Sequence, residues 1–102
     1  MAFNNYVKTI AAGASSDSDI LVREATTTDV IIGLNIANTH ATATATVKVE
    51  LGTTSLLENA KIPSGGAIEV IQGKIVIKDN DKINVTPTGA GVDVVMSVLE
   101  SA

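Results

Sequence analysis

The sequence predicts an all-β protein, a single antiparallel β-sandwich of about eight short strands with jelly-roll or Ig-like connections. Val and Ile dominate the apolar residues, and such β-branched side chains favour a pleated sheet over a helix. Apolar and polar residues alternate along several segments, and turn signals separate these segments about every ten residues. The same spacing would also suit a closed barrel.

The chain length predicts one domain. A chain of 102 residues matches the usual size of a domain, so we expect one sandwich over residues 1–102. Residues 1–5 contain one aromatic side chain and two asparagines. They are expected to form an N-terminal arm or the lead-in to the first strand, and such an arm could add a strand to a neighbour's sheet edge.

The segments expected to form strands are rich in β-branched residues or alternate between apolar and polar side chains. They are residues 6–11, 20–24, 28–38, 43–51, 56–62, 67–72, 74–78, 82–86 and 92–99. The clearest is 43–51, where Ala45, Val47 and Val49 alternate with polar residues. The segment 28–38 could also be helical, but its β-branched run and Gly33 favour a strand. Gly73 predicts a tight hairpin between its two neighbouring segments.

Two of these strands carry apolar residues on both faces. In 28–38, Ile31 lies opposite the alternating set of Val30, Ile32, Leu34 and Ile36. In 92–99, Val95 and Leu99 lie opposite the alternating set that begins at Val92. Burying one such side chain contributes about 1.5–3 kcal/mol, and soluble monomers rarely keep large apolar patches.

We therefore expect these outer faces to contact another subunit. Scattered outer apolar residues are also common on monomers, and a long loop could cover them. The expected interface residues, including the two aromatic residues near the N-terminus, are Phe3, Tyr6, Ile31, Val95 and Leu99.

The sequence offers little for catalysis or metal binding. The one histidine, His40, lies in a predicted turn, and no Gly-x-Ser-x-Gly accompanies it, because Ser64 belongs to a Pro-Ser-Gly-Gly turn. Two pairs of aspartates resemble part of a calcium loop but lack its Gly and Glu, so turns are favoured: Asp17 with Asp19, and Asp79 with Asp81. We expect no catalytic, cofactor-binding or metal-binding residues.

Composition restricts the partners. The net charge is −4 and the basic residues are scattered, which argues against nucleic-acid binding. No apolar run is long enough for a membrane helix, and no signal peptide is visible. The chain has no cysteine, so disulfides and thiolate sites are excluded, and the lack of disulfides fits synthesis in a reducing cytoplasm.

Four segments, in the same order, resemble small virion proteins of tailed bacteriophages. Residues 30–38 (VIIGLNIAN) are similar to the family's VIGLTLAN, residues 58–66 (ENAKIPSGG) to VKNAPIPAGS, and residues 92–100 (VDVVMSVLE) to VDVVLSVLEI. Residues 74–78 (KIVIK) followed by 81–83 (DKI) are similar to KIVLEAGDKI, although Asp79-Asn80 departs from the family's small residue and glycine.

The resemblance implies a structural β-sandwich protein of a phage particle that assembles in the host cytoplasm. The role that it favours is a capsid decoration or cement protein, a homo-oligomer, expected to be a trimer, that binds the major capsid protein or other virion proteins. A tail, neck or fibre-associated protein is the alternative within the particle. A receptor- or carbohydrate-binding module and a small enzyme are the other classes, and the scarcity of aromatic residues weighs against the first of these.

Overall fold

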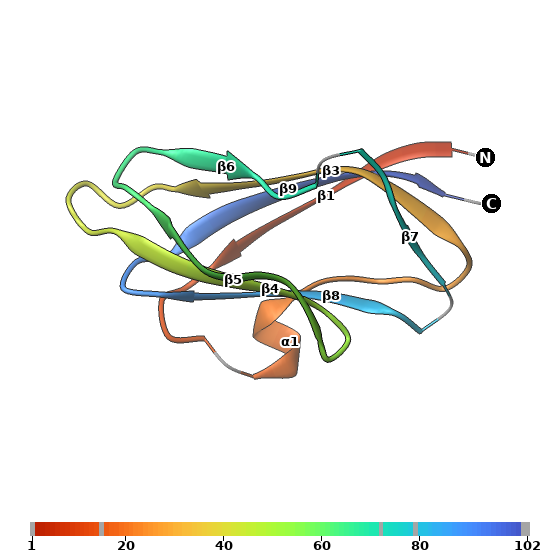
Figure 1. Cartoon of the computed structure of the whole chain (residues 1–102), viewed down its shortest axis with the longest axis horizontal. Helices are drawn as coiled ribbons and strands as arrows, with labels where there is room; N and C mark the ends of the chain where they lie inside the picture. Colours follow the sequence, from red (N-terminus) through yellow and green to blue (C-terminus); the bar gives the residue numbers. More distant parts are fainter. Residues whose placement is uncertain (1, 15, 72, 79, 101–102) are drawn as a thin grey trace.

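Two antiparallel sheets pack face to face, which confirms the predicted β-sandwich (Figure 1). The computed structural model describes residues 2–14, 16–71, 73–78 and 80–100. Within these ranges the elements are β1 (Ala2–Ile10), α1 (Asp17–Ile20), β2 (Leu21–Glu24), β3 (Asp29–Asn38), β4 (Ala45–Leu51), β5 (Thr54–Ile62), β6 (Ala67–Glu69), β7 (Ile75–Ile77), β8 (Lys82–Thr88) and β9 (Val92–Glu100). Sheet A has the order β1-β9-β3, with β6 and β7 both paired to β3, and sheet B has the order β2-β8-β4-β5.

The core lies between the sheets and consists of the inward residues of each alternating strand. In β4, Ala45, Val47 and Val49 are buried, while the residues between them are half-buried. In β9 the inward set begins at Val92 and ends at Val98. The alternation in the sequence therefore correctly predicts the inner faces of these strands.

The predicted hairpin at Gly73 is wrong. β6 and β7 do not pair with each other, because both pair antiparallel to β3, at Ala37–Asn35 and at Ile31–Asp29 respectively. They are two pieces of one interrupted edge strand that runs in a single direction along β3. Gly73 has φ +94, which fits an irregular connection as well as a hairpin turn.

The prediction that Ile31 lies on the outer face is also wrong, because β3 contains a bulge. The pairing of β3 with β9 shifts between Ile31 and Gly33. One extra residue in a strand exchanges its two faces, so Ile31 is buried before the bulge and Leu34 after it. Ile32 is the residue that the bulge leaves exposed.

The N-terminal segment is not a free arm. Residues 2–5 are the first part of β1, and they pair with β9 from Ala2 opposite Glu100 to Asn5 opposite Ser97. The two ends of the described chain therefore lie together at one end of the sandwich, as Figure 1 shows. Of the two expectations for this segment, the lead-in to a strand is the correct one.

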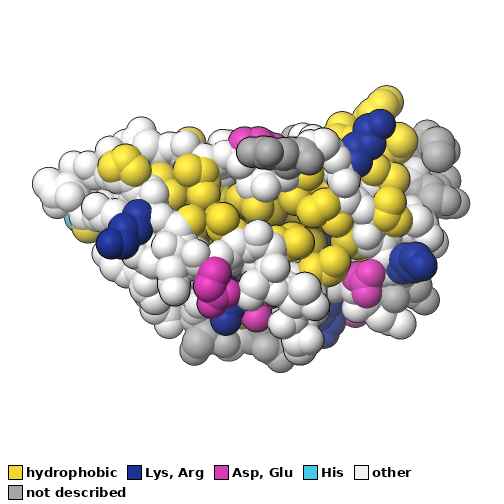
Figure 2. All heavy atoms as spheres, viewed as in Figure 1, with side chains coloured by type: hydrophobic (Ala, Val, Ile, Leu, Met, Phe, Trp, Pro, Cys, Tyr) yellow, Lys and Arg dark blue, Asp and Glu magenta, His cyan; other side chains and the backbone are white. Residues whose placement is uncertain are grey.

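Different contacts cover the core at the two long sides of the sandwich, where the edges of the two sheets face each other. On one side β1 of sheet A and β2 of sheet B meet, and the Arg23 guanidinium lies 4.6 Å from the centre of the Tyr6 ring. On the other side β5 faces the β6 and β7 segments, and half-buried apolar residues pack against the core. These residues are Leu56, Leu57, Ala60, Ile68, Val70 and Ile75. Figure 2 shows hydrophobic side chains visible along this side, between the two layers.

Candidate interaction surface

The outer face of sheet A carries a row of apolar side chains that crosses the strands from edge to edge. Directly opposite residues of antiparallel strands point to the same face. The pairing places Phe3 of β1 beside Leu99 of β9, Leu99 beside Val30 of β3, and Val30 beside Val76 of β7. Phe3 is 78% exposed and Val76 is 53% exposed, while Leu99 and Val30 are half-buried between them. We call Phe3, Leu99, Val30 and Val76 the apolar row.

Three more apolar residues enlarge this surface. Val7 of β1 lies opposite Val95 of β9, with exposed fractions of 70% and 40%. Ile32, at the bulge of β3, is 39% exposed. A shallow depression between these groups is lined by Phe3, Asn4, Asn5, Ile32, Ser97 and Val98. This part of the face is therefore apolar with a small polar hollow at Asn5 and Ser97.

The far end of the same face is polar. Thr9 Oγ1 donates a hydrogen bond of 2.7 Å to Asp93 Oδ1 on the neighbouring strand. The Glu69 carboxylate accepts the Leu34 N–H at 2.8 Å, which is a backbone donor at the bulge. An added Cβ at Gly33 would lie 3.2 Å from Glu69 Oε1, so the glycine leaves room for that carboxylate. The apolar surface thus extends from the end where the two chain ends lie as far as Val7 and Val95, and the face becomes polar at Glu69, Thr9 and Asp93.

The structure brings together three of the five predicted interface residues. Phe3, Val95 and Leu99 share the outer face of sheet A, whereas Ile31 is in the core. Tyr6 lies on the other side of β1, half-buried against Arg23. The sequence reasoning missed the exposed Val7, Ile32 and Val76. Val7 could have been found, because it alternates in phase with Phe3 along one strand.

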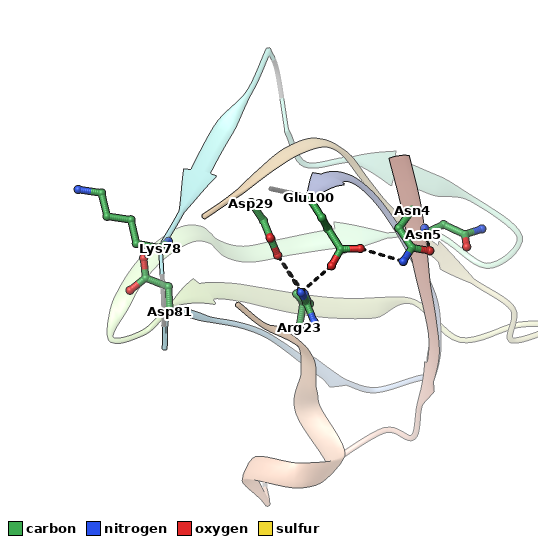
Figure 3. Close-up of polar contacts among 7 residues, drawn as sticks. All are labelled: Asn4, Asn5, Arg23, Asp29, Lys78, Asp81 and Glu100. Atoms are coloured by element: carbon green, nitrogen blue, oxygen red, sulfur yellow. Dashed lines mark hydrogen bonds and ion pairs between the residues drawn. The ribbon is translucent and has the colours of Figure 1, made fainter. Parts of the chain in front are cut away.

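A polar cluster ties the two sheets together beneath this surface (Figure 3). Arg23 of β2 bonds to Asp29 Oδ2 of β3 through Nε at 3.1 Å and Nη2 at 3.0 Å. The same Nη2 lies 2.9 Å from Glu100 Oε2 of β9. Asn4 Nδ2 donates to the other Glu100 oxygen at 2.8 Å. Asp29 is fully buried, and its Oδ1 has no hydrogen-bond partner among the described residues.

The cluster changes the acidity of two of its members. Hydrogen bonds from Asn4 and Tyr6 hold the pKa of Glu100 below its ordinary value, because they stabilise the carboxylate. Burial and the hydrogen bond to Glu100 raise the pKa of the Tyr6 hydroxyl, because both disfavour the phenolate. Tyr6 therefore acts as a neutral donor within the cluster at neutral pH.

The one histidine, His40, stabilises the loop between β3 and β4 through hydrogen bonds. His40 Nδ1 accepts the backbone N–H groups of Thr42 at 3.1 Å and Ala43 at 2.9 Å. The buried Asn38 side chain accepts the His40 N–H at 2.9 Å and donates to the carbonyls of Ala43 and Ile62, at 2.8 and 2.9 Å. His40 is exposed in this loop, as the predicted turn requires.

The candidate aspartates and Ser64 lie in turns or a short helix. Asp81 Oδ2 accepts the Lys78 N–H at 2.9 Å, which closes the β7–β8 turn, and Ser64 lies in a turn closed by Gly66 N to Pro63 O at 2.9 Å. Asp17 begins α1 and Asp19 is exposed within it, while Asp79 lies outside the described residues. In the described ranges, no three His, Asp or Glu side chains are grouped so that they could hold a metal ion. Nor does any helix there have the length and apolar character to cross a membrane.

Comparison with protein-family models and with curated proteins finds no significant match for this chain.

Proposed function

We propose that this chain is a structural subunit of a tailed-bacteriophage particle, most specifically a capsid decoration protein that binds other virion subunits through the outer face of sheet A. The observation that carries the proposal is the apolar row Phe3, Leu99, Val30 and Val76, which crosses all four strands of that region in direct register. A non-catalytic binding role suits a surface made of side chains that offer contact area and no reactive groups.

The free energy of association requires that most of this apolar surface is buried in the interface. Fully burying one Val, Leu, Ile or Phe side chain contributes about 1.5–3 kcal/mol. Association costs about 4–15 kcal/mol in lost translational and rotational freedom, so one or two such residues do not suffice. Burial of the row together with Val7, Ile32 and Val95 would exceed the lower part of that range. Multiple contacts to a repeating shell would add avidity.

The resemblance of four segments to phage virion proteins favours the same role. Two of the similar segments are residues 30–38, in β3, and 92–100, which form β9. These are the adjacent inner strands of the proposed binding face. A third segment, residues 74–78, includes Val76 of β7 on the same face, whereas residues 58–66 and 81–83 lie in sheet B or in turns.

Copy number in purified particles tests the location. Quantitative mass spectrometry should count this chain against the major shell protein of the same particles. Hundreds of copies per particle are expected for a decoration protein. A dozen or fewer would assign the chain to the tail or neck, and its absence from particles would overturn the virion proposal.

Substitutions on one face test the binding surface. Val76→Lys and Val95→Lys should each reduce binding to shells that lack this protein by at least about tenfold, because each introduces a charge that must lose its water on binding. The matched control is Ala67→Lys, which places the same charge on the polar end of the same face, in the row of Ala37 and Asp93. Equal binding of all three variants would exclude this face.

A further inference from the structure

The four edges of the two sheets differ in how they are protected. Exposed edge strands invite pairing with other chains, and proteins usually block them by making them short, irregular or charged. β2 has four residues and a register shift, β5 has two register shifts, and β6 and β7 are three-residue pieces of an interrupted edge. β1, by contrast, has nine residues and pairs with β9 without any shift. It contains no proline and no glycine.

The backbone of β1 presents hydrogen-bonding groups to its free side. The Asn5 N–H donates to Asn4 Oδ1 at 2.9 Å, so it points away from the ladder with β9. Because N–H and C=O groups alternate in direction along an antiparallel strand, those of Phe3 and Val7 point away from β9 as well. Lys8 Nζ donates to the Ser18 carbonyl at 3.1 Å, which places the segment leading into β2 next to the strand from Lys8 onward. Among the described elements no strand pairs with this side of β1 from Ala2 to Val7, although β2 approaches it through Arg23, which lies against the Tyr6 ring.

We propose that a second copy of this chain pairs with β1, antiparallel, about a two-fold axis at Asn5. In this register Asn5 faces Asn5 of the partner copy, and Phe3 faces Val7 in both directions. These are the residues whose backbone groups point to the free side, so each pair exchanges N–H···O=C bonds in both directions. The result is one sheet that continues from sheet A of one copy into sheet A of the other.

The outward side chains make this register self-complementary. Phe3 and Val7 are the two most exposed large apolar residues of the chain's described part. They lie symmetrically about Asn5, so the two-fold register places each against the other, and an aromatic residue across from a β-branched one is a favourable cross-strand pair. The Asn5 N–H exchanges its local bond to Asn4 for a bond to the partner copy.

The charges agree with the same register. Lys8 comes opposite Ala2, and Ala2 is paired with Glu100 on its other side. Glu100 belongs to the cluster with Arg23 and Asp29, whose formal charges sum to one negative charge. A lysine thus approaches a negative cluster at each end of the paired segment. A register shifted so that Lys8 met Lys8 would instead place like charges together, which destabilises a strand pair.

The pairing does not depend on the virion role. It uses the backbone edge of β1, leaves the outer face of sheet A uncovered and joins two apolar rows into one surface. A two-fold contact closes on itself and predicts a dimer, whereas the family resemblance implies a trimer.

Mass measurement with proline variants tests the edge. Light scattering of the full chain should give twice the 10.4 kDa chain mass at about 100 µM. Asn5→Pro should weaken the dimer at least tenfold while keeping the β1–β9 ladder, since that N–H faces away from β9. The matched control Thr9→Pro lies on the same edge outside the paired segment and should remain dimeric. A monomeric or trimeric wild-type mass, or equal loss in both variants, would overturn the proposal.

Single cysteines test the register without any proline. The chain has no cysteine of its own, so Asn5→Cys places one thiol per copy. Facing residues of such a pair have Cα atoms about 5.5 Å apart, within disulfide range. Val7→Cys places the two thiols about 13 Å apart along the strands, by the usual rise per residue. Mild oxidation should cross-link Asn5→Cys within the dimer and leave Val7→Cys largely uncross-linked. Cross-linking of both, or of neither, would contradict the two-fold register.

Discussion

A hydrogen bond of 2.8 Å joins Asn4 Nδ2 to Glu100 Oε1 across 96 positions of the sequence. The other oxygen of the same carboxylate accepts Arg23 Nη2 at 2.9 Å. Glu100 therefore connects the first strand, the last strand and an edge strand of the opposite sheet at one point (Figure 3). This contact closes the end of the sandwich that supports the apolar row.

Arg23→Ala should destabilise the fold by about 3–5 kcal/mol, because it leaves the charge of the buried Asp29 without its partner. Urea unfolding followed by circular dichroism measures the loss. Replacing both partners by apolar residues, as in Arg23→Met with Asp29→Leu, should recover part of it, since no unpaired charge then remains in the core.

Lys48→Ala is the control for Arg23→Ala. Lys48 lies 3.6 Å from Glu50 and 3.7 Å from Glu58, and all three side chains are partly exposed to solvent. We expect a loss below about 1 kcal/mol. Similar losses for the two variants would mean that burial does not distinguish the two ion pairs.

The stability of the fold should fall in acid partly through Glu100. Its pKa is lowered in the folded state from the ordinary value of 4.5, so its contribution is fully present above that value. The contribution is lost as the pH falls through the lower folded-state pKa. Urea midpoints measured at a series of acidic pH values should fall less steeply in Glu100→Gln than in the wild type. Identical pH dependence of the two proteins would remove Glu100 from this role.

The bulge in β3 predicts opposite behaviour for two neighbouring isoleucines. Ile31→Ala should cost about 2–5 kcal/mol, because it leaves a cavity in the core. Ile32→Ala, at the exposed position, should cost less than about 1 kcal/mol. Thermal unfolding of the two variants provides the measurement. A larger loss for Ile32→Ala would mean that the strand has no bulge and keeps one phase throughout.

Asn38→Ala should cost about 2–4 kcal/mol, since it leaves the carbonyls of Ala43 and Ile62 without their donor in a buried site. The exposed neighbour Thr39→Ala is the control and should change stability by less than about 0.5 kcal/mol. Amide hydrogen exchange would locate the effect, with faster exchange expected at His40, whose N–H is bonded to the Asn38 side chain.

The sequence predicted where most strands lie, but it did not predict which residues of β3 point into the core. The alternation of β4 and β9 continues from end to end, so their inner residues could be predicted. In β3 the alternation in the sequence is equally regular from Val30 to Ile36, yet the chain leaves it at the bulge. A bulge is decided by the neighbouring strand and by contacts such as Glu69 to the Leu34 N–H, which are far apart in the sequence.

The sequence predicted only part of the candidate surface, because that surface also depends on contacts between strands that are far apart in the sequence. Val95 and Leu99 follow from the phase of one strand, whereas the row from Phe3 to Val76 exists only once four strands are in register. The charged cluster could not be predicted from the sequence. The regular alternation places Asp29 with Ile31 on the expected outer face, and both turn inward only because of the bulge, so the sequence did not reveal that this charge is buried. Its partner, Arg23, could not be chosen from the sequence alone.

The pairing of Ala2 with Glu100 also affects the order of events during synthesis. β1 leaves the ribosome first, but its only partner strand among the described elements is β9, which leaves it last. Until then the growing chain carries the β1 segment, with Phe3 and Val7, without the strand that pairs with it in the fold. Because unpaired strand edges and exposed apolar residues favour aggregation during folding, the late arrival of β9 makes the β1 segment the part of this fold that stays unprotected longest.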